Sequence, residues 1–232
     1  MKVMFFVDYD NFKQALVRSK NRYPDFDKVP KFLFQRINSL LGWEEYNPRL
    51  IRTYVYSGEY SKNLLNKVKL KLRNNQYKKE QVEDYLPKLK EETSIQNQCF
   101  QRLKLCHFVD LKLKPLQFSR RELRVFQKGT DVQLAVDLVH HAYQDNFDTA
   151  IVCSGDVDLL ESIRLVKNLG KKVVLVAHPD NIAYDMNKEG DFFYNLSKLK
   201  EEEIKTISFE LAQPKKDQLN QPSDKEESNN LN

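Results

Sequence analysis

Apolar residues along this chain gather in short dense runs, and these runs alternate with stretches in which apolar positions recur at helical spacing. The runs at 2–7, 49–56, 149–153 and 173–177 are rich in β-branched and aromatic side chains, and polar or turn-forming residues follow each of them. A short apolar run bounded in this way is typical of a strand in a parallel sheet that is covered on both faces. We therefore predict a strand at each of these positions.

Amphipathic helices are predicted between the runs. Residues 29–41 place their apolar side chains on one helical stripe, and Gly42 follows where a left-handed residue would end a helix. In the segment 130–143, Thr130 and Gln133 have the spacing of a capping box, which predicts a helix start. A third helix is predicted to end before Gly170 for the same reason as the first.

Strands that alternate with amphipathic helices predict an α/β fold, a Rossmann-like three-layer α/β/α sandwich with a mainly parallel sheet of about five or six strands. We expect one domain over residues 1–200. Within it, residues 59–106 are rich in Lys, Asn, Gln and Leu and predict a basic helical insertion, and the alternating segment 108–118 predicts an edge strand. Residues 213–232 contain almost no apolar side chain, so a disordered polar tail is expected.

The composition narrows the class of protein. Charged residues make up 31% of the chain, and no apolar stretch approaches the roughly 20 residues that span a bilayer. The opening segment turns acidic at Asp8, before the hydrophobic region of a signal peptide could form, so we expect a soluble cytoplasmic protein without a membrane partner. A net charge of +5 permits a polyanionic partner. Cys99, Cys106 and Cys153 lack the spacing of a disulfide framework or a zinc site.

Aspartates follow the predicted strands. Asp8 comes directly after the first strand, and Asp156 and Asp158 come after the run 149–153, while Asp131 stands at the start of a helix. Ligands of an open parallel sheet bind beyond the carboxyl ends of its strands, so these side chains should meet there. Clustered carboxylates repel one another unless a cation neutralises them, and hard oxygen ligands suit Mg²⁺ or Mn²⁺. Such a site can hydrolyse a phosphodiester bond.

Each of these residues also has an ordinary structural explanation. An aspartate at a helix start is commonly an N-cap, which is the alternative for Asp131 and Asp158 taken singly. Asn11 either caps the helix after the first strand or orients a metal-bound water. Asp137 lies in an apolar helical stretch, so it either faces solvent or joins the cluster. The remaining candidates are expected to be structural: Asp10 exposed or a loop cap, Asp191 at the beginning of a strand, and His140 and His141 structural or at the surface.

Three segments together resemble a known family. They are FFVDYDNF from residue 5, KGTDVQLAVDLVHHAY from residue 128, and DTAIVCSGDVDLLESIRLVKNLGKKVVLVA from residue 148. In combination they resemble the NYN domain of LabA-like proteins, a PIN-like family, over roughly residues 2–196. The resemblance implies that Asp8, Asp131, Asp156 and Asp158 form an acidic metal-binding pocket with Asn11 beside it. Residues 60–106 match no segment of that family.

The leading functional hypothesis is a metal-dependent ribonuclease that prefers single-stranded RNA, with Mg²⁺ or Mn²⁺ at the aspartates. Basic side chains would hold the RNA backbone; these are Lys128, Lys67, Lys69, Lys71 and Arg73. A solvated helix face is the alternative for the last four. The first rival hypothesis is a non-catalytic module that binds RNA or protein. The second is a phosphatase of the haloacid-dehalogenase type, suggested by Asp8 and Asp10, although Phe12 stands where that family has Thr or Val. A homodimer is left open.

Overall fold

The computed structural model describes residues 1–17, 21–73, 79–119 and 124–211. In this part of the chain six strands form one sheet in the order β4-β3-β1-β7-β8-β9, and every neighbouring pair is parallel. The predicted α/β class with a mainly parallel sheet is confirmed. The strands are β1 (Lys2–Asp8), β3 (Arg49–Glu59), β4 (Val109–Pro115), β7 (Thr149–Cys153), β8 (Lys172–Ala177) and β9 (Phe192–Asn195).

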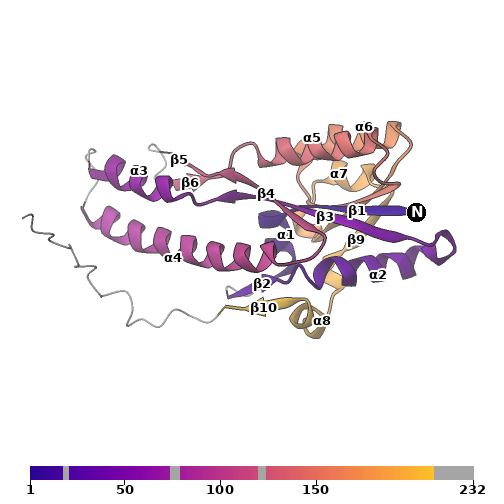
Figure 1. Ribbon diagram of the computed structural model, residues 1–232, viewed down its shortest axis with the longest axis horizontal. Coiled ribbons are helices and arrows are strands. Elements are labelled where there is room, and N and C mark those ends of the chain that lie inside the picture. Colours follow the sequence, from indigo (N-terminus) through magenta and orange to yellow (C-terminus); the bar gives the residue numbers. More distant parts are fainter. Residues whose placement is uncertain (18–20, 74–78, 120–123, 212–232) are drawn as a thin grey trace, which may run out of the picture.

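Helices cover both faces of the sheet (Figure 1), and the central strand β1 shows why. Val3, Phe5 and Val7 point to one side of β1, Met4 and Phe6 point to the other, and both sets are buried. A strand that is apolar on both faces must be covered on both. One layer consists of α5 (Thr130–Tyr143), α6 (Leu160–Asn168) and α7 (Tyr184–Glu189), and the other contains α1 (Tyr9–Leu16), α2 (Val29–Leu41) and part of α4 (Lys79–Lys104).

The segment predicted as a basic helical insertion contains two helices among its described residues. They are α3 (Lys62–Arg73) and α4, which pack with a hairpin formed by β5 (Gln117–Ser119) and β6 (Arg124–Phe126). Leu64, Val68 and Leu89 form the centre of a small separate core between them. The insertion extends from the edge of the sheet where β1 and β3 end (Figure 1).

The predicted strand over 108–118 is divided in the structure. Its first part is β4, an edge strand that ends at Pro115 as expected, and the chain then enters β5 of the hairpin. Proline has no N–H to donate, so it is tolerated where the ladder stops.

The described chain closes with α8 (Glu201–Thr206) and β10 (Ser208–Glu210), which pairs antiparallel with β2 (Arg22–Pro24). The polar tail at 213–232 lies outside the described residues. In the part of the chain that the structure describes, no helix combines the length and the apolar character needed to cross a membrane. Short 3₁₀ turns occupy Trp43–Tyr46, Val157–Leu159, Pro179–Asn181 and Leu196–Lys198.

Candidate active site

Asp8 is the last residue of the central strand β1 and the N-cap of α1. Its carboxylate accepts a hydrogen bond from the backbone N–H of Asn11 at 3.2 Å, and only 6% of the residue is exposed. Asp8 therefore fills the capping position that was one alternative for Asn11. The half-buried Asn11 lies in the first turn of α1, beside this carboxylate.

Asp156 follows the neighbouring strand β7, at the same end of the sheet as Asp8. Val7 of β1 is in register with Cys153 of β7, so the two strands deliver their aspartates at one edge of the sheet. Asp156 caps the following 3₁₀ turn by accepting the N–H of Asp158 at 3.0 Å, while its own N–H donates to the hydroxyl oxygen of Ser154 at 3.2 Å. Asp156 is half-buried and Asp158 is exposed.

Glycine is required between Ser154 and Asp156. A Cβ on Gly155 would lie 2.0 Å from the backbone oxygen of Asn181, far inside van der Waals contact. The end of the 3₁₀ turn Pro179–Asn181 therefore packs directly on the Ser154–Asp156 turn. This close backbone contact at Gly155 fixes the position of the loop that carries Asp156.

Asp131 enters from the start of α5, whose local structure differs from the prediction. The N-cap is Gly129, with a φ of 81°, and no side chain caps the helix, so the predicted capping box is wrong. Thr130 is instead the first helical residue. Its hydroxyl oxygen and the side-chain oxygen of Gln133 are buried without a hydrogen-bond partner among the described residues. Neither Thr130 nor Gln133 therefore caps the first N–H groups of α5, next to Asp131.

The carboxylates influence one another electrostatically. Burial raises the pKa of Asp8 to about 7; the hydrogen bond from Asn11 opposes this rise, and the negative charges of Asp131, Asp10 and Asp156 add to it. The pKa of Asp131 is also raised, first by burial and then by Asp156 and Asp158. The aspartates predicted from separate parts of the sequence are thus near enough to influence one another's pKa.

Asp10 is exposed, as the sequence suggested, and it also lies near enough to Asp8 and Asp131 to influence their charge. Its side chain is open to solvent, yet surrounding protein atoms raise the pKa of the carboxyl, while the Ser57 hydroxyl, which donates at 3.3 Å, and Lys13 lower it. Asp131 adds to the rise. Ser57 comes from the end of β3, so no local sequence signal could have linked it to Asp10.

A hard divalent cation fits the chemistry of this donor set, which consists of carboxylate oxygens with an amide and hydroxyls beside them. Among the described residues, however, no three His, Cys, Asp or Glu side chains are arranged as a ready metal cage. Mg²⁺ commonly takes one or two carboxylates and keeps several waters, so the donors suit a hydrated ion rather than a closed structural site. Asp8, Asp131 and Asp156 are the side chains that would hold it.

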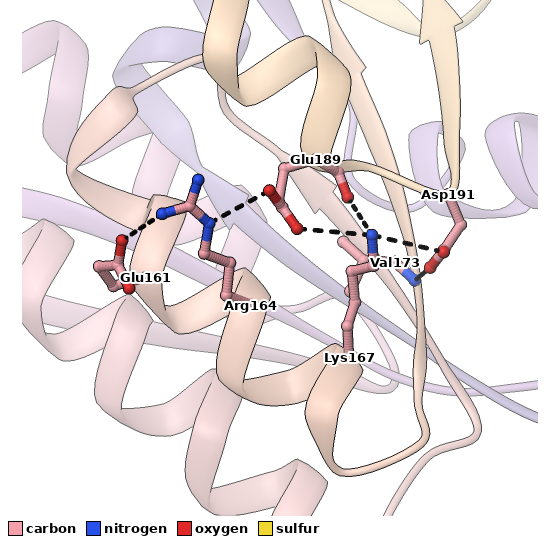
Figure 2. Close-up of polar contacts among 6 residues, drawn as sticks. All are labelled: Glu161, Arg164, Lys167, Val173, Glu189 and Asp191. Carbon is pink, nitrogen blue, oxygen red and sulfur yellow. Dashed lines mark hydrogen bonds and ion pairs between the residues drawn. The ribbon is translucent and has the colours of Figure 1, made fainter.

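Two other aspartates have structural partners. Asp137 is half-buried and accepts a hydrogen bond from the hydroxyl of the fully buried Tyr56 at 3.0 Å, a structural contact that the sequence did not predict. Asp191 accepts the N–H of Val173 at 2.7 Å and lies 3.7 Å from the Lys167 ammonium (Figure 2). It immediately precedes β9, as expected for the beginning of a strand.

The two histidines have other surroundings. His141 stacks on Tyr54 with ring centroids 4.8 Å apart, and His140 is exposed. The expectation that both are structural or surface residues is confirmed.

The basic residues predicted to bind substrate fall into two groups. Lys128 is exposed and precedes Gly129, close in sequence to Asp131. Lys67 and Lys69 are exposed on α3, whose apolar side packs on the insertion core. Lys71 and Arg73 belong to α3 by their backbone, and their side chains lie outside the described set.

Comparison with known proteins identifies the family. A family model for the NYN domain matches residues 2–200. The chain belongs to the NYN domain family. An NYN domain is a member of the PIN-like nuclease superfamily, and the parallel sheet flanked by helices agrees with that fold.

The NYN domain described here is also similar to a solved structure. This is a protein of unknown function, VPA0982, from Vibrio parahaemolyticus, with 16% sequence identity and a TM-score of 0.49. The similarity covers 84% of this chain and 91% of that chain. The search of curated proteins found no match.

Proposed function

We propose that this NYN domain is a metal-dependent ribonuclease that hydrolyses phosphodiester bonds of single-stranded RNA, in the manner that the LabA-like resemblance implies. The observation that carries the proposal is the proximity of Asp8, Asp131 and Asp156 at the carboxyl edge of the sheet, where the negative charges of Asp131 and Asp156 both raise the pKa of Asp8. Carboxylates that destabilise one another are retained where a cation binds between them. Asp158 and Asn11 complete the set.

The residues divide the work according to their positions. Asp8 is buried at the end of the central strand β1, so its position is fixed by the core. Asp131 and Asp156 are half-buried and come from two other elements. A bound Mg²⁺ or Mn²⁺ would supply positive charge to the scissile phosphate and its leaving oxygen. The exposed ammonium of Lys128 and the uncapped N–H groups of α5 both attract a phosphate.

The test is incubation of purified protein with end-labelled RNA in Mn²⁺ or Mg²⁺, with and without EDTA. We expect cleavage of a single-stranded oligonucleotide that EDTA abolishes, and much slower cleavage of a duplex of the same sequence. Asp8→Asn and Asp156→Asn should each reduce the rate by orders of magnitude. Asp145→Asn is the matched control, because Asp145 pairs with Lys2 at the opposite end of β1. Equal rates in all variants, or cleavage that persists in EDTA, would contradict the proposal.

A non-catalytic binding module is the second candidate. The observation in its favour is that the described carboxylates are not arranged as a ready metal cage. This candidate predicts RNA binding that EDTA does not change and no cleavage with any divalent ion. The same incubation therefore separates the two functions.

A further inference from the structure

A cavity of about 370 Å³ opens beside Asp10, between the sheet edge and the insertion. This volume lies within the roughly 300–1,000 Å³ of small-ligand pockets. Its walls come from α1, α4, the end of β3 and the strand β6. Asp10 lines the cavity and also lies near the other carboxylates, so the cavity adjoins the carboxylate site.

The cavity is held open by hydrogen bonds over long sequence separations. The side-chain amide of Gln96 donates to the oxygen of Gly58 at 2.9 Å and accepts the N–H of Tyr60 at 2.9 Å. Gln127 accepts the N–H of Gly58 at 2.7 Å from the opposite wall. A Cβ on Gly58 would lie 2.3 Å from a methyl carbon of Leu116, so the walls meet directly here. These contacts preorganise the space for a ligand.

The polar groups of the lining have defined roles. Since the oxygen of Gln127 takes the Gly58 N–H, its NH₂ group is a donor, and among the described residues no hydrogen bond of that group is recorded. Lys13 adds a second donor, an ammonium 4.3 Å from the centre of the Tyr23 ring. Asp10 and Glu92 are acceptors, and Glu92 also accepts the Tyr60 hydroxyl at 2.8 Å.

Aromatic side chains supply part of the remaining surface, beside Ile95, Cys99, Leu116 and Val125, and they suit a flat ligand. Tyr9, Tyr23, Tyr60 and Phe126 all line the cavity. Stacking of a base on an aromatic ring is a common mode of single-strand recognition. Donors beside carboxylate acceptors match a base edge that carries a carbonyl next to an imino N–H, which guanine and uracil have and adenine and cytosine lack.

We propose that this cavity binds the base of the nucleotide adjoining the cleaved phosphodiester, and that it prefers the keto bases guanine and uracil. The inference rests on the proposed ribonuclease function and adds that a base of the substrate binds between the insertion and the sheet edge. Gln127 and Lys13 donate to the base carbonyl, and Asp10 or Glu92 accepts the imino proton.

The test measures binding of GMP, UMP, AMP and CMP to the full chain in EDTA by calorimetry, so it does not depend on cleavage. We expect GMP and UMP to bind more tightly than AMP and CMP. Gln127→Glu keeps an acceptor for the Gly58 N–H and removes the NH₂ donor, so the keto preference should fall about two- to tenfold, the effect of one hydrogen bond. The negative charge that Gln127→Glu adds acts on all four nucleotides, and any uniform effect cancels in the ratio of keto-base to other affinities.

Gln98→Glu is the matched control, because Gln98 is exposed on α4, contacts Ser94 and does not line the cavity. It should leave the keto preference unchanged. Equal affinities of the four nucleotides for the wild-type protein, or an unchanged ratio in Gln127→Glu, would overturn the base assignment. If the protein cleaves RNA without a keto preference, the cavity proposal fails and the ribonuclease stands. If the preference is present without cleavage, the ribonuclease proposal fails and the cavity is a nucleotide site of a binding module.

Discussion

At the scale of single residues, Asp156 combines a structural and a chemical role that two substitutions can separate. It caps a turn through the N–H of Asp158, and its charge raises the pKa of Asp8 and Asp131. Asparagine retains the cap and removes the charge, whereas alanine removes both. The pair of variants therefore distinguishes a capping residue from a member of a repulsive cluster.

We expect Asp156→Asn to leave the metal-free protein as stable as the wild type or more stable, because one repulsive charge is gone. Asp156→Ala should be less stable than Asp156→Asn by about 1 kcal/mol, the usual effect of losing a cap. Urea unfolding in EDTA measures both. A clear loss of stability in Asp156→Asn would show that the charge itself stabilises the fold.

Tyr56 and Asp137 offer a second residue-scale test. The Tyr56 hydroxyl is buried and donates to the half-buried Asp137. Tyr56→Phe should lower the free energy of unfolding by about 1 kcal/mol, since the carboxylate loses a hydrogen bond but keeps some contact with water. RNA cleavage should stay near the wild-type rate, because this pair lies outside the proposed metal set. A large loss of cleavage with unchanged stability would place Asp137 in the active site.

At the scale of elements, a network of ion pairs connects α6 to the last residue of α7 and to Asp191, which precedes β9 (Figure 2). Lys167 donates to the backbone oxygen of Glu189 at 2.6 Å and lies 3.6 Å and 3.7 Å from the carboxylates of Glu189 and Asp191. Arg164 bonds to Glu161 and Glu189 farther out, where its side chain is 46% exposed. The ion pairs of Lys167 are therefore more shielded from solvent than those of Arg164.

Lys167→Met should therefore destabilise the protein by about 1 kcal/mol, because a backbone carbonyl and two carboxylates lose their cation. Arg164→Met is the matched comparison and should cost less than about 0.5 kcal/mol, as exposed ion pairs do. Denaturant unfolding at low and high salt measures both variants. Equal losses that both vanish at high salt would show that the network acts only as surface charge.

At the scale of the whole molecule, the net charge of +5 is modest, so the distribution of cations matters more than their number. The insertion carries Lys67 and Lys69 exposed on α3, and it extends from the edge of the sheet at which β1 and β3 end (Figure 1). An RNA strand that follows the insertion toward the site would cross these cations.

Replacing Lys67 and Lys69 together by Gln should weaken RNA binding and reduce the slope of log affinity against log salt by about 1.4, if each lysine neutralises one phosphate of a single strand. The control is the pair Lys198 and Lys205, exposed near α8, changed in the same way. Fluorescence anisotropy over a salt series in EDTA gives the slope. An unchanged slope would make this side of α3 an ordinary solvated face.

The sequence by itself determined the elements whose signals are local. The buried strands β1, β7 and β8 follow from apolar runs, and the left-handed residues Gly42 and Gly170 follow from glycines at helix ends. The spacing of the three motifs also indicated the family and the aspartates that are candidate metal ligands. The capping box failed although its spacing was correct, because Gly129 took the N-cap position and left Thr130 inside the helix.

Only the tertiary structure decided which distant residues meet. Asp10 bonds to Ser57 across 47 positions, and Gly58 bonds to Gln127 across 69, so neither pair leaves a periodic trace along the chain. Their proximity depends on the strand order and on how the insertion packs against the sheet edge. Periodicity reports the side of an element that is buried, whereas the neighbours of a side chain depend on long-range packing, which a single sequence does not encode locally.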